Sequence, residues 1–290
     1  MTFRSFLRAV TTAGAAALAT VGLCVSAGPA QAQPGADVVV FGDSYVSNPD
    51  QVQHTILRLT GALNLPYPGT YTNTGGCLQS DDNWPRQMQA ITGRRVADWS
   101  CSGANSAHVL SRVEQAIHAG DLNAGTRAVA IAAGFNDYWP GSVIQFNTRY
   151  DQGLIERNYV SNVQAAVTRV RSVAPEARII IPGMLSLTEP YGAHMVCFIN
   201  VVPNLPGGIP SPLLQQVEEL NRSNQIAAAA AVGGQFVDIK GGSSYHNSCA
   251  KDAQRWVAGS IDTTTSNYHM SFHPNFEGSR FVANEVAAVL

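Results

Sequence analysis

The chain has 290 residues, of which 45% are hydrophobic and 13% are charged, and its formal net charge is −2. This composition excludes an intrinsically disordered chain, and the lack of a basic block argues against a nucleic-acid partner. The length is sufficient for one sizeable hydrophobic core, and the low charged fraction is typical of an extracellular protein.

The first 32 residues have the pattern of a secretory signal peptide. Two arginines precede an apolar segment, and the small-x-small sequence AQA ends at Ala32. We therefore expect cleavage near Ala32, secretion, and a single domain over residues 33–290. A membrane anchor is the alternative, but Ala, Gly and Thr make the segment only modestly hydrophobic. Lipid attachment at Cys24 is disfavoured because a bulky leucine precedes that cysteine.

Five short apolar runs, rich in β-branched residues, alternate with helical patterns along the rest of the chain. The runs lie at residues 36–44, 95–104, 127–137, 177–184 and 234–241. Continuous apolar runs are typical of parallel strands that are buried on both faces. Strands that alternate with helices predict a doubly wound α/β fold with a central parallel sheet, which binds ligands at the carboxyl ends of its strands.

Apolar residues at helical spacing predict three of the intervening helices. They are a helix marked by Val160, Val163, Val167 and Val170, a helix over residues 211–231 with Ser211 as N-cap, and a last helix over residues 275–290 with Val282, Val286 and Val289 inside. Two other segments, 69–85 and 197–212, have the composition of long loops, which in a compact domain are usually functional or mobile.

An even number of cysteines remains after removal of the signal peptide, which predicts disulfides in an exported protein. They are Cys77, Cys101, Cys197 and Cys249. Four cysteines allow three pairings, and we favour Cys77–Cys101 with Cys197–Cys249 because these close short loops. Free structural thiols are the alternative. The chain has no CxxC pair, which argues against a zinc ribbon.

Four residues with catalytic chemistry follow the predicted strands or precede the last helix: Ser44, Gly103, Asn136 and His273. Because the carboxyl ends of parallel strands share one edge, these residues can converge. A serine hydroxyl becomes an effective nucleophile when a base takes its proton, and His273 can be that base. The N–H groups of Ser44 and Gly103 and the amide of Asn136 can stabilise an oxyanion.

The motifs GDSY, SGA, GFND and HPN, in this order, resemble the conserved blocks of the SGNH (GDSL-type) hydrolases. Each motif alone is weak, but the four together span nearly the whole chain after residue 32. The segments CLQSDDNWP and CSGA resemble those of secreted actinobacterial esterases and lipases of this family, a likeness that supports the Cys77–Cys101 pairing. The resemblance implies a three-layer α/β/α flavodoxin-like sandwich and hydrolysis of carboxylic esters without a metal or cofactor.

This sequence departs from the family at one position. The family commonly has Asp three residues before the catalytic histidine, whereas this chain has Met270 there. A methionine side chain is a poor acceptor for the imidazole N–H, and some secreted relatives use a backbone carbonyl at this place. The resemblance therefore implies that the Met270 carbonyl orients His273. The side chain of Asp262 is the alternative.

We expect a secreted, monomeric lipase or esterase that takes a small-molecule or lipid ester and does not insert stably in a membrane. Residues 135–146 and 197–210 could form an apolar acyl groove, or could simply be ordinary loops. The alternatives are an O-acetyl esterase for polysaccharides and an acyltransferase acting on cell-envelope glycolipids. A catalytically dead binding domain would be marked by loss of Ser44 or His273, and both residues are present.

The same residue types also have structural interpretations. Ser44 could serve only as a helix cap, and Asn136 only as a turn residue. Asp137 is interpreted as a structural hydrogen-bonding residue. The other six histidines lack metal-ligand spacing and are interpreted as surface residues or as neighbours of the site.

Overall fold

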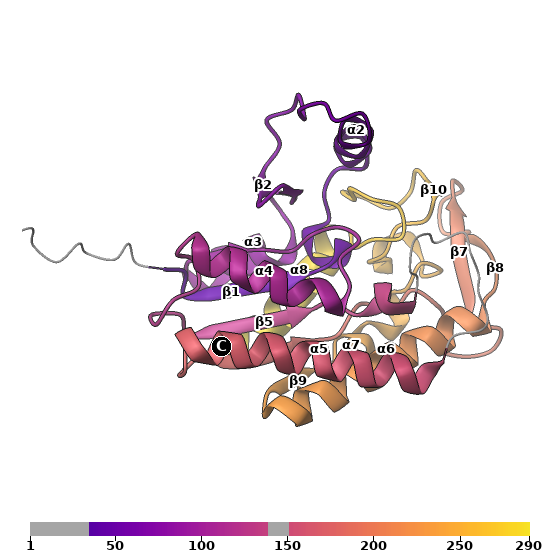
Figure 1. The fold of residues 1–290 in the computed structure, drawn as a ribbon. Coiled ribbons are helices and arrows are strands. Elements are labelled where there is room, and N and C mark those ends of the chain that lie inside the picture. Colours follow the sequence, from indigo (N-terminus) through magenta and orange to yellow (C-terminus); the bar gives the residue numbers. More distant parts are fainter. Residues whose placement is uncertain (1–34, 139–150) are drawn as a thin grey trace, which may run out of the picture. The chain divides into compact units, whose positions relative to one another are not determined.

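A five-stranded parallel sheet lies at the centre of the computed structural model, which describes residues 35–138 and 151–290 (Figure 1). The strands in spatial order are β4 (Val96–Asp98), β1 (Val38–Gly42), β5 (Ala128–Ala132), β6 (Arg178–Pro182) and β9 (Gln235–Val237). Taken along the chain, the order is second, first, third, fourth and fifth, which is the flavodoxin-like order. All five strands were predicted, and the α/β fold class is confirmed.

Helices cover both faces of this sheet. One layer holds α4 (Ser106–His118), α5 (Gln152–Val173) and α6 (Pro212–Val232), and the other holds α1 (Ser44–Ser47), α3 (Trp84–Thr92) and α8 (Phe276–Ala287). Residues of β1 alternate between the layers, because Val39 and Phe41 join one core whereas Val38 and Val40 join the other. Burial on both faces explains why this strand is a continuous apolar run.

The three predicted helices are present, and their ends follow capping chemistry. Asp151 and Asn275 accept N-terminal backbone N–H groups of α5 and α8, whereas Ser211 occupies the N-cap of α6 without a side-chain bond. Helix α8 ends at Ala287, so Val289 packs against the core from beyond the helix. Helices α3 and α4 were not predicted from the sequence, nor was α2 (Gln51–Ala62), which buries none of its residues.

The two segments interpreted as long loops contain short strands. Strands β2 (Asn73–Thr74) and β3 (Cys77–Leu78) pair antiparallel, as do β7 (Met195–Asn200) and β8 (Gly207–Pro210), and β10 (Ile261–Asp262) joins β7. The loop interpretation of residues 197–212 is therefore wrong over both strands. The prolines and glycines that suggested a loop lie mainly in the turn between β7 and β8 and along β8.

Both disulfides have the favoured pairing. Cys77–Cys101 ties β3 to the loop after β4, and Cys197–Cys249 ties β7 to a segment 52 residues later. The described residues, 35–138 and 151–290, form one compact unit. The predicted signal peptide 1–32 and residues 139–146 of the predicted acyl groove lie outside the described residues. Among the described helices, none combines the length and the hydrophobicity that a membrane span requires.

Candidate active site

Ser44 lies at the sharp turn that joins β1 to α1. At Gly42, where β1 ends, a Cβ atom would collide with the Val46 side chain, which favours glycine here. Asp43 is the N-cap of α1, and its carboxyl oxygen accepts the Tyr45 N–H at 2.9 Å. Ser44 is therefore the first residue of the helix rather than its cap. Within the described residues its own N–H has no hydrogen-bond partner and is available to a ligand.

The loop after β4 runs beside this turn. The Cys101 N–H donates to the Gly42 carbonyl at 2.9 Å, and the Ser102 and Ser47 hydroxyl oxygens lie 3.1 Å apart. Gly103 follows with φ +80°, in the left-handed region that favours glycine. In the part of the chain that the structure describes, the Gly103 N–H also has no partner. Two free backbone donors thus belong to adjacent segments.

Asn136 follows β5 in the 3₁₀ helix Phe135–Tyr138. Its side-chain nitrogen donates one N–H to the Ala104 carbonyl at 2.8 Å, and the second N–H of the amide has no hydrogen-bond partner among the described residues. Asp137 accepts the Ser106 N–H at 3.0 Å and also the Ser106 hydroxyl. These bonds fasten the Asn136 turn to the Gly103 loop, and they confirm the structural role predicted for Asp137.

His273 is oriented by a backbone carbonyl, but not by the one expected. Its Nδ1 atom lies 2.7 Å from the carbonyl oxygen of Ser271, whereas the Met270 carbonyl accepts the backbone N–H of His273 at 3.3 Å. The assignment of Met270 as the orienting residue is therefore wrong. Phe272, which lies between Ser271 and His273, has the left-handed conformation with φ +60°. This turn of the backbone is the physical reason why Nδ1 meets the Ser271 carbonyl instead of the Met270 carbonyl.

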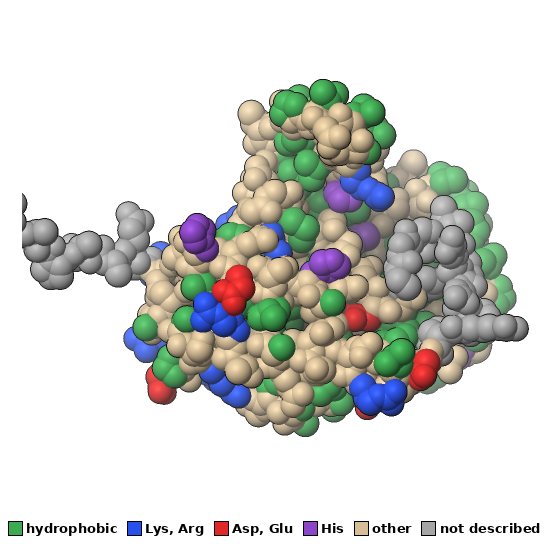
Figure 2. Space-filling view, in the orientation of Figure 1, with side chains coloured by type: hydrophobic (Ala, Val, Ile, Leu, Met, Phe, Trp, Pro, Cys, Tyr) green, Lys and Arg blue, Asp and Glu red, His purple; other side chains and the backbone are tan. Residues whose placement is uncertain are grey.

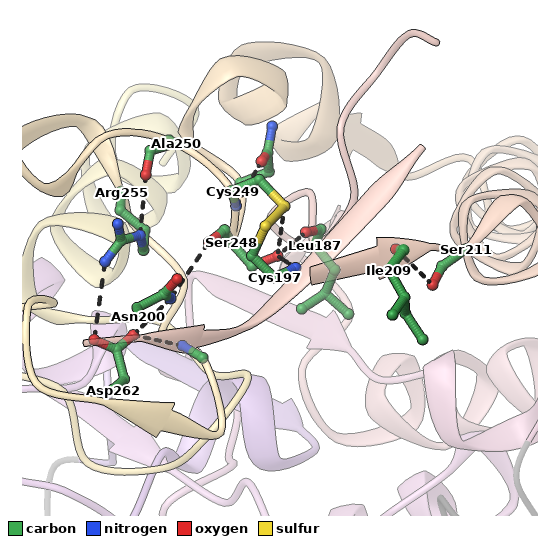
Figure 3. Close-up of a disulfide and its surroundings, with 12 residues drawn as sticks. Leu187, Cys197, Asn200, Ile209, Ser211, Ser248, Cys249, Ala250, Arg255 and Asp262 are labelled. Atoms are coloured by element: carbon green, nitrogen blue, oxygen red, sulfur yellow. Dashed lines mark hydrogen bonds and ion pairs between the residues drawn. A yellow bond between two sulfur atoms is a disulfide. The ribbon is translucent and has the colours of Figure 1, made fainter. Parts of the chain in front are cut away.

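Asp262 takes part in a different network, away from the imidazole. Its carboxylate accepts from the side chains of Asn200 and Thr265 and from the Gly259 N–H, and it faces the buried Arg255 (Figure 3). Burial opposes the charge of Asp262, but these hydrogen bonds outweigh it and hold its pKa below the ordinary value. In this structure Asp262 therefore does not orient His273, and the alternative is wrong.

The histidine loop is fastened to the helix that carries Ser44. The Tyr45 hydroxyl donates to the Phe272 carbonyl at 2.7 Å, and the centre of its ring lies 4.9 Å from that of the His273 imidazole. The Asn48 side chain donates to the Pro274 carbonyl at 2.9 Å. Residues that neighbour Ser44 in the sequence therefore hold both sides of His273.

A small cavity of about 20 Å³ lies behind these segments. Its lining includes Asp43 and Tyr45, on either side of Ser44, together with Phe135 before Asn136 and Pro274 after His273. Segments that are up to 231 residues apart in the sequence, from Asp43 to Pro274, thus meet at one edge of the sheet, as predicted for the carboxyl ends of parallel strands.

The electrostatics of the site favour a neutral imidazole. Burial lowers the pKa of His273 to about 4, against the opposing effect of the hydrogen bond to Ser271, and His54 on α2 contributes in the same direction as burial. Because Nδ1–H donates to a carbonyl, the lone pair lies on Nε2. Nε2 is shielded from solvent and has no hydrogen-bond partner within the described residues, so it is free to accept a proton.

Sequence reasoning missed an ion pair beside this loop. His269 Nε2 lies 2.7 Å from a carboxylate oxygen of Asp82, and the His269 carbonyl accepts the Gln51 N–H at 3.0 Å. No local pattern could reveal a contact between residues 187 positions apart. Among the described residues, no cluster of three or more His, Cys, Asp or Glu side chains could hold a metal ion.

Comparisons with known proteins bear on the family of the chain. The family model described as "GDSL-like Lipase/Acylhydrolase family" matches residues 40–281. "Lipase 2" of Streptomyces coelicolor is 28% identical to this chain, and the alignment covers 98% of this chain and 97% of that protein.

Two solved structures have the same fold. An extracellular lipase from Streptomyces rimosus superimposes with a TM-score of 0.58 at 19% identity, covering 88% of this chain and 100% of that one. Phospholipase A1 from Streptomyces albidoflavus gives a TM-score of 0.57, also at 19% identity, covering 88% and 99%. Because the family model matches most of this chain, the chain belongs to the GDSL-like lipase/acylhydrolase family and is an ester hydrolase of the lipase and esterase type.

Proposed function

We propose that the protein is a secreted hydrolase of carboxylic esters that works through a Ser44–His273 dyad and an acyl-enzyme intermediate. Ser44 Oγ attacks the acyl carbonyl while His273 Nε2 accepts the hydroxyl proton. The tetrahedral oxyanion takes hydrogen bonds from the Ser44 N–H, the Gly103 N–H and the Asn136 side chain.

The remaining steps reuse the same base. When the tetrahedral intermediate collapses, His273 Nε2–H protonates the leaving alcohol and Ser44 keeps the acyl group. A water molecule then attacks the acyl-enzyme, its proton passes to Nε2, and the acid leaves as Ser44 Oγ regains that proton.

One observation carries this proposal, the 2.7 Å contact between His273 Nδ1 and the Ser271 carbonyl. It fixes the tautomer in which Nε2 is the base, and burial keeps the ring neutral by lowering its pKa. A neutral carbonyl stabilises the imidazolium less than a carboxylate would. The three oxyanion donors offset part of this loss, because each is worth roughly 3 kcal/mol in comparable sites.

A serine-directed phosphonate probe tests the dyad. We expect rapid labelling of the wild type and no labelling of Ser44→Ala. Ser102→Ala is the matched control, since it removes a neighbouring hydroxyl that bonds to Ser47 and should leave labelling unchanged. Equal labelling of wild type and Ser44→Ala would reject the mechanism.

Secretion and a lipid-like substrate are part of the same proposal. Two disulfides suit an oxidising compartment, and the relatives named above include an extracellular lipase and a phospholipase A1. Chromogenic esters of increasing acyl length should be hydrolysed faster at medium length than as acetate. A sharp preference for acetate would favour the O-acetyl esterase, and ester products formed with a competing alcohol would reveal an acyltransferase.

A further inference from the structure

Helix α2 exposes an apolar stripe that would normally face a core. Val52, Ile56, Leu59 and Leu63 recur at helical spacing, yet the side chains of Val52, Leu59 and Leu63 are 63%, 59% and 67% exposed. Surface helices usually turn such a stripe inward. In Figure 2 hydrophobic side chains cover the region of α2. An exposed apolar patch on a soluble domain marks an interaction surface.

A second exposed apolar group lies on the β7–β8 hairpin. Val202, Leu205 and Ile209 are 49%, 67% and 52% exposed, and Figure 2 shows hydrophobic side chains along the edge where β7 and β8 lie. Ile261 on the neighbouring strand β10 is 59% exposed. We call the α2 stripe and this group the two apolar rims.

Hydrogen bonds connect both rims to the loop that carries His273. On one side, the Gln51 N–H at the start of α2 donates to the His269 carbonyl at 3.0 Å. On the other side, the Phe198 carbonyl of β7 accepts the Ser260 N–H at 2.8 Å, and the Ser260 carbonyl accepts the Ser271 hydroxyl at 3.4 Å. The rims therefore flank the catalytic loop rather than occupying a remote surface.

The charge of the rims selects among possible partners. Residues 51–65 contain one charged side chain, Arg58, and no acid, and residues 195–210 contain no charged side chain at all. A protein partner held by ion pairs would find few charged groups here. The acids beside the rims are engaged in hydrogen bonds, since Asp252 accepts the Asn204 N–H in the hairpin turn and Asp50 caps α2. Two apolar segments that contribute no acid of their own fit a lipid–water interface, where apolar side chains enter the acyl boundary and cations meet the head groups.

We propose that the two apolar rims dock the enzyme on the surface of aggregated phospholipid, so that the His273 loop faces the interface. The proposal rests on the lipid-ester substrate proposed above and adds where the interface is bound. Docking by apolar contact should depend only weakly on salt, because ion pairs contribute little to it.

Binding can be measured apart from catalysis with phosphatidylcholine vesicles. In the Ser44→Ala background, which prevents vesicle hydrolysis, we expect co-sedimentation that barely changes when NaCl is raised from about 0.1 M to about 0.5 M, although this roughly halves the screening length. Leu59→Ser combined with Leu63→Ser should weaken this partition at least about tenfold, because burying one leucine is worth more than a factor of ten. Val202→Ser with Leu205→Ser should weaken it similarly.

A matched control uses exposed leucines on the layer of α4 and α5. Leu110 and Leu154 are 37% and 47% exposed, and Leu110→Ser with Leu154→Ser should leave vesicle binding unchanged. With a functional Ser44, all three double variants should hydrolyse a soluble short-chain ester at the wild-type rate. If the wild type did not hydrolyse this soluble ester, the proposed function would be rejected. The result of the vesicle-binding experiment would be unaffected.

Three results would overturn the docking proposal. The first is that Ser44→Ala does not bind the vesicles, and the second is that the control variant loses binding as much as the rim variants. The third is a dimer in sedimentation velocity that Leu59→Ser with Leu63→Ser converts to a monomer, since a second copy would then cover the α2 stripe.

Discussion

The Nδ1 atom of His273 lies 2.7 Å from the carbonyl oxygen of Ser271, two residues earlier in the same turn. The acceptor is part of the main chain, so no side-chain substitution can remove it. A dyad of this kind should tolerate loss of any nearby carboxylate, provided that the turn keeps its shape.

Asp262→Asn separates catalysis from stability. The substitution removes a charge that faces the fully buried Arg255, and loss of one partner from a buried pair typically costs about 3–5 kcal/mol. We expect a lower free energy of unfolding in urea but an unchanged kcat per titrated active site. Asp252→Asn, at the more exposed partner of Arg255, should destabilise less. A large fall in kcat of a fully folded Asp262→Asn would instead show that this carboxylate orients His273.

In the mechanism proposed above His273 is the base, so the acid limb of the pH–rate profile should report its protonation state. Burial lowers its pKa to about 4, below the ordinary value of 6.5, so the base stays neutral as the pH falls through 6. We expect kcat/KM for a soluble ester to stay level down to about pH 5 and to halve near the lowered pKa. Circular dichroism at each pH checks folding. As the pH falls from 6.5 to 4, His273 binds a proton in the unfolded chain but not in the folded protein, so the stability of the fold decreases over that range. An acid limb centred at pH 6.5, measured while the enzyme is folded, would contradict the lowering of the His273 pKa by burial.

Features that depend on local pattern could be predicted from the sequence. The five strands are continuous apolar runs because both faces are buried, and short loops indicated the disulfide pairing. The approach of the segments that carry Ser44 and Asn136, whose neighbours Tyr45 and Phe135 line one cavity, follows from the parallel topology, since ligand sites form where the strands end.

Features that depend on tertiary detail could not be predicted. Whether Ser271 or Met270 accepts from His273 depends on the left-handed conformation of Phe272, which its residue type does not indicate. Helix α2 does carry apolar residues at helical spacing, but the sequence does not reveal that this stripe stays exposed rather than joining the core, and β7 and β8 carry Pro and Gly in and around their turn. The pair of His269 with Asp82 joins two loops that are distant in the sequence.

Asp43, next to Ser44, should behave as a neutral cap at mildly acidic pH. Burial raises its pKa to about 7, against the hydrogen bond from Tyr45, and the nearby Asp137 adds to the rise. The folded state therefore holds a proton that the unfolded chain loses above 3.8, so this group lowers stability as the pH rises from 3.8 to 7. Asp43→Asn should keep the cap and remove that loss, whereas Asp43→Ala, which removes the cap as well, should be about 1 kcal/mol less stable than Asp43→Asn at any pH. Urea midpoints at pH 5 and pH 8 measure both effects, and an Asn variant that gains nothing at pH 8 would contradict the raised pKa.

The pair of His269 with Asp82 should stabilise the catalytic loop only within a defined pH window. The hydrogen bond to Asp82 raises the pKa of His269. For Asp82, burial is the largest single effect and raises the pKa, but the hydrogen bond and charge of His269, together with the hydrogen bond from Ser80, outweigh it and lower the pKa. The contribution of the histidine is complete below 6.5 and is lost as the pH rises through its raised pKa. That of the aspartate is complete above 3.8 and is lost as the pH falls through its lowered pKa.

His269→Gln tests this window, because glutamine keeps a donor but carries no charge. Both side chains are partly exposed, so the difference in unfolding free energy from the wild type should be only about 0.5–1 kcal/mol between pH 4 and 6.5. It should shrink as the pH rises beyond the raised pKa, where the wild-type histidine is neutral as well. Because His269 lies in the loop that presents His273, kcat on a soluble ester should fall severalfold over the same window with little change in KM. His118→Gln, at the exposed end of α4, is the matched control, and a pH-independent deficit in His269→Gln would mean that the pair acts through packing rather than charge.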